Sequence, residues 1–242
     1  MSKKTKQVGE LIFGVHPILE LLKTKRRKLI AIYTTKPEPK VFAQVKRLMP
    51  KYPVAIQYVK RDILHKMAET TDHQGIVAWV QKYPFKKKFF ESKKDSFLLM
   101  LDGIQDPRNL GAILRSAYCT GVDGVILIKK GSAPLNAVAL KASAGLAERL
   151  EIFVASSAKS AVQQLKDAGY KIYLAVLNGQ DATKSDFTEP LCLVVGGEGS
   201  GISKMILSYG KQITLPQSKA DISYNASVAA GILLFWIKNN IV

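Results

Sequence analysis

Residues 97–115 read FLLMLDGIQDPRNLGAILR, and this stretch decides the fold class. Its first five residues are all apolar, which predicts a short strand buried on both faces. The polar turn DGIQDP follows, and the apolar spacing after it predicts a helix over about 110–120 with Asn109 as its N-cap. A turn that leads from a buried strand into a helix N-terminus favours an anion, because backbone N–H groups and the helix dipole point at it.

The same alternation continues to the end of the chain. We expect further strands at 125–129, 171–177, 191–195 and 212–215, and helices at 136–144, 160–168 and 225–238. Strands that alternate with helices form a mostly parallel sheet with both faces covered. The predicted fold class of residues 96–242 is therefore α/β, with an open and mostly parallel sheet.

Residues 1–83 predict a separate, smaller α/β domain. Helices are expected at 11–22, 41–48 and 61–69, and strands at 29–33, 54–59 and 76–80. Residues 84–95 carry many charges and no usable periodicity, so we interpret them as a basic linker. The predicted organisation is thus 1–83, a linker over 84–95, and 96–242.

Positive charge is concentrated in the N-terminal part. The chain has 36 Lys and Arg against 19 Asp and Glu, a formal net charge of +17. Residues 1–95 carry 22 basic and 8 acidic side chains (net +14), whereas residues 96–242 carry 14 and 11 (net +3). The asymmetry favours a polyanion-binding module joined to a chemical module. An acidic membrane surface and simple solubility are the alternatives, but there is no basic amphipathic helix with a Trp/Phe face.

Other features narrow the class of protein. No run of about 18 uncharged apolar residues occurs, so we expect no membrane span. Cys119 and Cys192 are far apart and form neither a metal-ligand pair nor a disulfide framework. The expected protein is cytoplasmic and needs no metal.

A glycine-rich segment, GGEGSGIS at 196–203, follows the apolar strand expected at 191–195. Glycines at a strand end let a ligand approach the backbone. The segment is not a P-loop, because Ile202 and not Lys follows Gly201. It is not a Rossmann fingerprint either, since the third glycine is missing from the required spacing. A tight turn before a helix is the structural alternative.

A third segment combines a strand end with a helix of small residues. ITLP at 213–216 ends the last strand, and SYNASVAAG at 223–231 begins the last helix. Small residues permit close helix packing, which alone could explain the composition. Each of the three segments is ambiguous when it is taken singly.

Together, their order and spacing resemble the three motifs of the SpoU (TrmH-like) family of RNA methyltransferases. The matching residues are Asp102, Asp106, Pro107, Asn109, Gly111 and Arg115 in the first motif, Gly196, Glu198 and Gly201 in the second, and Pro216, Ser223, Asn225 and Ser227 in the third. FGVHP at 13–17 and HQGI at 73–76 resemble the substrate-binding domain of the subgroup that acts on 23S ribosomal RNA. Tyr224 departs from the family, which usually has Leu there, and this puts the shape of the adenine pocket in doubt.

The resemblance implies a fold, a cofactor and partners. Family members have a C-terminal trefoil knot that forms the S-adenosyl-L-methionine pocket, and homodimerisation completes the site. The N-terminal domain would be similar to the RNA-binding ribosomal L30e-like fold. Carried over by position, cofactor contacts are expected from Gly196, Leu215 and Tyr224, largely through backbone groups, and from Asn225, which together with Glu198 would brace the same loops.

The implied reaction is methylation of the ribose 2′-hydroxyl of a guanosine in 23S rRNA. The expected catalytic residues are Asn109, Arg115 and Glu198. Because Arg is a poor base, Arg115 is expected to hold a phosphate and stabilise the developing alkoxide, although a base role is an alternative. His16 and His73 are expected to have structural or RNA-packing roles. The alternative functions are a tRNA ribose methyltransferase and a non-catalytic RNA-binding assembly factor.

Overall fold

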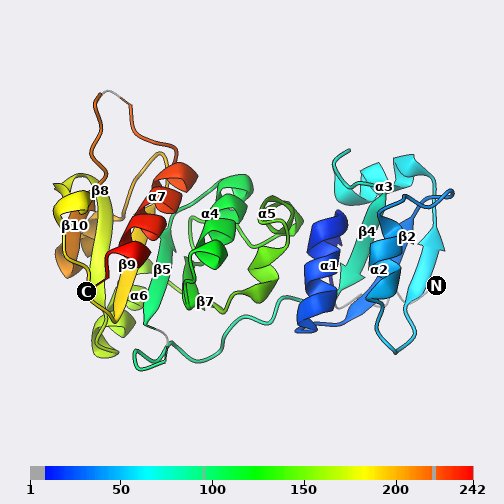
Figure 1. The fold of residues 1–242 in the computed structure, drawn as a ribbon, viewed down its shortest axis with the longest axis horizontal. Coiled ribbons are helices and arrows are strands. Elements are labelled where there is room, and N and C mark those ends of the chain that lie inside the picture. Colours follow the sequence, from blue (N-terminus) through cyan, green and yellow to red (C-terminus); the bar gives the residue numbers. More distant parts are fainter. Residues whose placement is uncertain (1–8, 95, 220–221, 242) are drawn as a thin grey trace, which may run out of the picture. The chain divides into compact units, whose positions relative to one another are not determined.

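The computed structural model describes residues 9–94, 96–219 and 222–241, and its elements are labelled in Figure 1. The chain forms two compact units. The first contains the residues up to Pro84 together with Asn136–Arg149, and the second contains Phe85–Leu135 and the residues from Leu150 onward. The division predicted from the sequence instead placed residues 136–149 with the rest of 96–242.

A four-stranded sheet in the order β1-β4-β2-β3 organises the first unit. Strands β2 and β3 are parallel, whereas β4 is antiparallel to both β1 and β2. The strands are β1 (Glu10–Phe13), β2 (Leu29–Thr34), β3 (Ala55–Tyr58) and β4 (Ile76–Val80). The helices are α1 (Val15–Thr24), α2 (Phe42–Arg47), α3 (Arg61–Ala68), α5 (Ala137–Ala142) and the 3-10 helix η1 (Leu146–Arg149).

The prediction of one helix over 11–22 is wrong at its start. Glu10–Phe13 form β1, which pairs with β4, and α1 begins only at Val15. Gly14 separates the two elements with a backbone φ of +87°, a conformation that favours glycine. The later apolar residues of the pattern, such as Ile18 and Leu22, are buried on α1, so the helical spacing holds from residue 15 onward.

Buried polar contacts hold the segment 136–149 in the first unit. The guanidinium of Arg27 is almost completely buried and contacts both carboxylate oxygens of Glu148, which is itself buried. The Tyr83 hydroxyl donates a hydrogen bond of 2.9 Å to the carbonyl oxygen of Ala147. Burial of such an ion pair is tolerated because each charge is paired and hydrogen-bonded.

A six-stranded sheet in the order β10-β8-β9-β5-β6-β7 forms the second unit. Its neighbouring strands are all parallel, which confirms the predicted α/β class with a mostly parallel sheet. The strands are β5 (Phe97–Asp102), β6 (Gly124–Ile128), β7 (Ile152–Ala155), β8 (Lys171–Asp181), β9 (Leu191–Gly196) and β10 (Lys211–Thr214). Strand β7 was not predicted.

Helices cover both faces of this sheet. The helices are α4 (Pro107–Cys119), α6 (Ala158–Asp167), α7 (Ala226–Asn239) and the 3-10 helices η2 (Ala182–Lys184) and η3 (Lys204–Tyr209). Helices α4 and α7 pack side by side (Figure 1). Residues of α6 pack against alternate residues of the strands, among them Leu98, Met100 and Val194. All six residues of β5 are buried, as a strand covered on both faces requires.

Part of the predicted linker has fixed contacts in the second unit. Lys86 forms a parallel bridge with Phe153 at the edge of β7. The ring of Phe90 is buried and fills the space that a Cβ atom at Gly124 would need. Residues 85–90 are therefore anchored and do not hang free.

The two central strands bring the predicted motifs to one edge of the sheet. In the β5–β9 ladder Asp102 is opposite Gly196, so the segments that follow both strands begin at the same level. The buried carboxylate of Asp102 accepts a hydrogen bond of 2.8 Å from the backbone N–H of Ser203. This edge carries the candidate site. Within the described ranges, none of the helices has the length and apolar character that a membrane crossing requires.

Candidate active site

Helix α4 begins three residues before the predicted position. Asp106 is its N-cap, and its carboxylate accepts a hydrogen bond of 2.8 Å from the backbone N–H of Arg108, with Pro107 in the first helical position. The prediction that Asn109 caps this helix is therefore wrong. Because Asp106 fulfils that role, the amide of Asn109 is free to contact a neighbouring loop.

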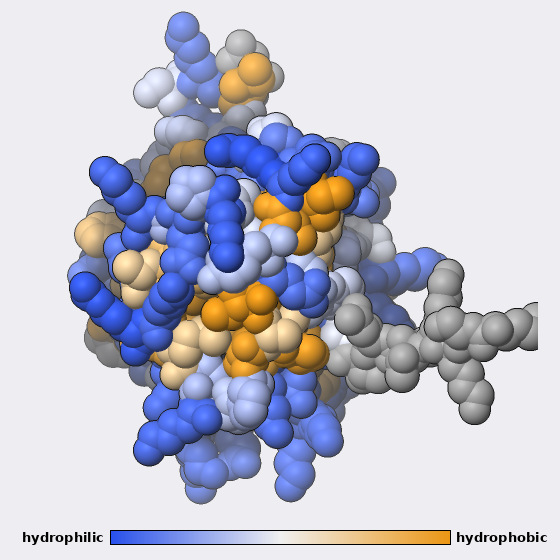
Figure 2. Space-filling model, turned by 90° about the vertical axis from the view of Figure 1, so that its right-hand side faces the viewer, coloured by the Kyte–Doolittle hydropathy of each residue, from blue (hydrophilic) through white to orange (hydrophobic). Residues whose placement is uncertain are grey.

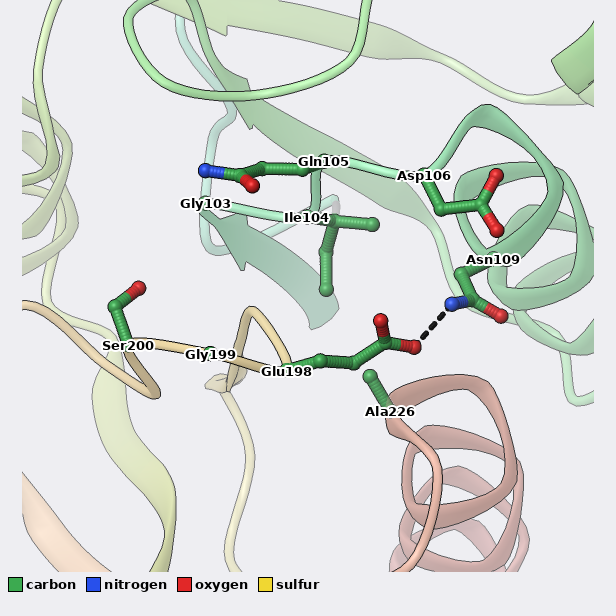
Figure 3. A pocket seen from close by; sticks show the side chains of 9 residues that line it. All are labelled: Gly103, Ile104, Gln105, Asp106, Asn109, Glu198, Gly199, Ser200 and Ala226. Atoms are coloured by element: carbon green, nitrogen blue, oxygen red, sulfur yellow. Dashed lines mark hydrogen bonds between the residues drawn. The ribbon is translucent and has the colours of Figure 1, made fainter.

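Asn109, Glu198 and Asn225 form one hydrogen-bonded cluster. The amide of Asn109 donates to Glu198 Oε1, as Figure 3 shows. The amide of Asn225 donates to the same oxygen at 2.8 Å and is 3.4 Å from Asn109 Oδ1. A carboxylate that accepts two amide donors orients both side chains. The structure thus brings together one residue from each of the three predicted motifs.

Asn225 also determines where the last helix begins. Its Oδ1 accepts hydrogen bonds from the backbone N–H of Ser227 at 2.9 Å and from the Ser227 hydroxyl at 2.6 Å. Asn225 is thereby the N-cap of α7 and a member of the cluster with Glu198. This double role explains why Asn225 and Ser227 occur two residues apart in the third motif.

Close backbone packing requires the glycines of the second motif. A Cβ atom at Gly197 would lie 2.1 Å from the carbonyl oxygen of Gly103. At Gly196 a Cβ atom would lie 2.2 Å from the carbonyl carbon of Gly201. Only glycine fits at either position, so the segment after β9 lies directly against the turn after β5.

A cavity of about 460 Å³, here called the large pocket, opens beside this segment. It is lined by residues of β8, by the ends of β9 and β10 with the residues that follow them, and by the start of α7. These residues lie in the ranges 175–178, 195–202, 212–217 and 223–233. Gly196, Leu215 and Tyr224 all line it, whereas Asn225 does not. Three of the four expected cofactor contacts therefore share one cavity, and Asn225 caps the helix next to it.

A second cavity of about 240 Å³, here called the small pocket, adjoins the large one. Its lining comprises Gly103, Ile104, Gln105, Asp106, Asn109, Glu198, Gly199, Ser200 and Ala226 (Figure 3). Four of these residues, Glu198, Gly199, Ser200 and Ala226, line the large pocket as well. The two pockets therefore share a wall, and groups bound in them would face each other across Glu198.

Arg115 lies away from both pockets. It is six positions after Asn109 on α4, about 240° around the helix axis at about 100° per residue. Its side chain is exposed and, in the part of the chain that the structure describes, makes no hydrogen bond or ion pair. The structure does not bring Arg115 to Asn109 and Glu198 within one protomer.

His16 and His73, for which structural or RNA-packing roles were expected, both lie outside this site. His16 is exposed at the start of α1, in the first unit. His73 is buried there, and its Nδ1 accepts a hydrogen bond of 2.9 Å from the backbone N–H of Gly75. Burial, followed by the charges of His65 and Arg61, lowers the pKa of His73 below its ordinary value. These contacts agree with the structural role expected for His73.

Sequence reasoning missed several lining residues. Gln105 and Ser200 line the small pocket, and Leu177 in β8 lines the large one. Gln105 and Ser200 lie inside motifs that were identified by other residues. Leu177 carried no signal, because its strand was predicted only from its apolar content.

Among the described residues no three His, Cys, Asp or Glu side chains form a cluster that could hold a metal ion.

Both parts of the sequence match known families. Residues 96–235 match the SpoU rRNA Methylase family, and residues 11–86 match the family described as RNA 2′-O ribose methyltransferase substrate binding. Similar proteins include the 23S rRNA (guanosine-2′-O-)-methyltransferases RlmB of Shewanella oneidensis (32% identical over 236 residues) and Pasteurella multocida (33% over 247 residues). These alignments cover 93% and 95% of this chain and 95% and 98% of the relatives.

Solved structures share the fold over nearly the whole chain. An RNA 2′-O ribose methyltransferase superposes with a TM-score of 0.84 at 22% identity, and covers 97% of this chain and 89% of its own. The SpoU methyltransferase AviRb from Streptomyces viridochromogenes, solved with AdoMet, superposes with a TM-score of 0.81 at 20% identity, over 98% and 92%. These two structures show similarity of fold only, because their sequences are less than 25% identical to this chain. The relatives above 30% identity show similarity of sequence. On this evidence the chain belongs to the SpoU rRNA methylase family.

Proposed function

We propose that this protein methylates the 2′-hydroxyl of a guanosine in 23S ribosomal RNA, with S-adenosyl-L-methionine as the methyl donor. The observation that carries the proposal is the shared wall between the large and small pockets, at the cluster of Asn109, Glu198 and Asn225. Methyl transfer requires donor and acceptor to be held side by side in line. The relatives named above carry this activity in their names.

The large pocket suits S-adenosyl-L-methionine. Apolar side chains such as Leu177, Leu215 and Leu233 offer contact area for an adenine ring, and the backbone of Gly196 is open to close approach. Gly196, Leu215 and Tyr224 would hold the cofactor, which supplies a methyl group already activated on a sulfonium. Tyr224, 46% exposed, would lie at the rim, where Tyr in place of Leu is tolerated.

The chain's own residues then orient the acceptor. Glu198 fixes the amides of Asn109 and Asn225, so that Asn109 presents a defined edge to the ribose in the small pocket. Attack of the 2′-oxygen on the methyl group that the cofactor would supply requires the 2′-hydroxyl to give up its proton, which passes to water where Arg115 stays protonated. A cation near this oxygen stabilises the developing alkoxide. Arg115 would provide this cation and contact an adjacent phosphate, and direct proton removal by Arg115 is the alternative.

Arg115 requires a second copy of the chain to reach the site. Helix α7 exposes Val228, Ile232 and Phe235, which are spaced along one face, and Phe235 is 64% exposed. Such a stripe is typical of an interface. We therefore include a homodimer in the proposal, in which Arg115 on α4, beside α7, completes the partner's site.

The remaining parts of the proposal concern the domains and the knot. Residues 1–83 would be an L30e-like RNA-binding domain, 84–95 a basic connection and 96–242 the methyltransferase, with its C-terminal segment threaded as a trefoil knot in a cytoplasmic protein. Strand β8, the segment that follows β9, strand β10 and the start of α7 meet around one cavity, which supports the knot. Figure 2 shows hydrophilic side chains around hydrophobic ones on one face of the molecule. In the first unit, the exposed aromatic side chains of Tyr52 and Tyr58 support RNA contact.

The test is transfer of labelled methyl groups to unmodified transcripts of 23S rRNA and of total tRNA, with the product analysed as nucleosides. We expect 2′-O-methylguanosine in the 23S transcript. Transfer to tRNA alone would favour the tRNA-modifying alternative. No transfer to either RNA, with RNA binding retained, would favour the non-catalytic assembly factor.

A further inference from the structure

The small pocket has two polar ends. At one end Asn109 and Glu198 are hydrogen-bonded to each other, and at the other lie the side chains of Gln105 and Ser200 (Figure 3). The side chain of Ile104, which is 2% exposed, projects between the two ends. A flat group could therefore lie over this buried floor while its polar edge meets Gln105 and Ser200.

The side chains of Gln105 and Ser200 have no hydrogen-bond partner, unlike those of Asn109 and Glu198 at the opposite end of the pocket. In the described part of the chain, neither the Gln105 amide nor the Ser200 hydroxyl makes a hydrogen bond, and both residues are exposed. An unbound amide offers two donors and an acceptor side by side. Asn109 and Glu198 instead bind each other. Gln105 is therefore a lining group with its full hydrogen-bonding capacity available to a ligand.

The charge of the lining excludes a phosphate as that ligand. The small pocket is lined by the carboxylates of Asp106 and Glu198 and by no Lys or Arg among the described residues. A phosphate presents only acceptors and negative charge, whereas a base edge presents donors beside acceptors. Guanine carries N–H donors at N1 and N2 beside the O6 acceptor, which suits a lining rich in acceptors.

We propose that Gln105, assisted by Ser200, reads the base of the nucleotide whose ribose is methylated, through hydrogen bonds to the N1–H and O6 edge of a guanine. This inference rests on the proposed function. Gln105 lines the small pocket and not the large one, so it acts on the acceptor alone. The base would enter the pocket unpaired, as bases read on this edge must.

The experiment compares the wild-type protein with Gln105→Ala on an unmodified 23S rRNA transcript. The readouts are kcat/KM, the set of 2′-O-methylnucleosides after complete digestion, and the affinity for S-adenosylhomocysteine. We expect kcat/KM for guanosine to fall roughly tenfold, the effect of about one hydrogen bond. Other 2′-O-methylnucleosides should appear beside 2′-O-methylguanosine, and S-adenosylhomocysteine affinity should stay unchanged.

Gln163→Ala is the matched control, because Gln163 is an exposed glutamine of α6 that lines neither pocket. It should behave as the wild type in all three readouts. Unchanged kinetics and an unchanged product in Gln105→Ala would overturn the inference. So would slower transfer with 2′-O-methylguanosine as the sole product, since that indicates a structural role. If the wild-type protein itself transfers no methyl group, the proposed function fails instead, and the two failures are distinguishable.

Discussion

The two compact units use their polar side chains in opposite ways. In the first unit, the buried Arg27 guanidinium is bound by the buried carboxylate of Glu148, by Glu10 and by the Gln81 carbonyl oxygen. In the second unit, Gln105 in the turn after β5 and Arg115 on α4 are exposed and make no side-chain hydrogen bond in the described part of the chain. Buried paired charges are costly to unpair, whereas exposed donors without a partner are available to a ligand. The comparison predicts that variants in the two units affect different observables.

The largest effect is expected on stability, from the buried pair. Glu148→Ala leaves the buried Arg27 guanidinium with only the Glu10 carboxylate and the Gln81 carbonyl oxygen as partners, which should cost about 3 kcal/mol of unfolding free energy. The measurement is chemical unfolding followed by circular dichroism. Glu91→Ala is the control, because Glu91 pairs with Lys94 at an exposed position and its loss should have no measurable effect.

A double variant makes this prediction sharper. Arg27→Met combined with Glu148→Leu removes both charges and should recover most of the stability lost in Glu148→Ala. If Glu148→Ala alone unfolds at the wild-type denaturant concentration, the buried pair does not hold 136–149 in the first unit.

The second-largest expected effect is a loss of methyl transfer in an Arg115 variant whose stability is unchanged. Arg115→Ala should lower single-turnover methyl transfer on the order of a hundredfold to a thousandfold, about 3–4 kcal/mol, because the proposed mechanism uses this guanidinium as a donor fork for a phosphate and a nascent alkoxide. Arg115→Lys should rescue poorly, since Lys lacks the planar fork. Unfolding and S-adenosylhomocysteine affinity should both stay at wild-type values.

This prediction depends on the position of Arg115 outside the large pocket. Near-normal turnover of Arg115→Ala would show that the residue has no part in the reaction. Parallel loss of S-adenosylhomocysteine affinity and turnover would show that it serves the cofactor instead.

Much of the second unit could be predicted because buried parallel strands give continuous apolar runs, as at Phe97–Asp102. Strand β7 (Ile152–Ala155) was not predicted because its four apolar residues are too few to show a period that separates a strand from a helix. The N-cap of α4 was misplaced because Asp106 and Pro107, three residues earlier, already form a favourable helix start. Local competition of this kind is not resolved by apolar spacing.

The candidate site was predicted only in part. Asn109, Glu198 and Asn225 meet as one cluster, and Gly196, Leu215 and Tyr224 line one cavity. The position of Arg115 could not be read from its place in the motif, because a spacing of six residues puts it on a different side of the helix. Likewise, Arg27 and Glu148 are 121 positions apart, and no local pattern links them.

RNA affinity should depend on lysines of the first unit. Lys51, Lys60 and Lys66 are exposed there, and their combined replacement by Gln should lower affinity for the 23S transcript about tenfold and reduce the slope of log K against log salt. The control replaces three exposed lysines of the second unit, Lys159, Lys204 and Lys238. Equal losses in the two triple variants would contradict a division between RNA binding and chemistry.

The smallest expected effect is a pH dependence of the first unit's stability. Burial, followed by the charges of His65 and Arg61, lowers the pKa of His73 in the folded state. The unfolded chain, with an ordinary histidine pKa of about 6.5, therefore binds more protons than the folded chain as pH falls below that value. Stability should be constant above about pH 6.5 and decline below it. His73→Asn keeps an acceptor for the Gly75 N–H but cannot be protonated, so its thermal unfolding should decline less between pH 7.5 and pH 5.5. An equal decline in both proteins would assign the pH dependence to other groups.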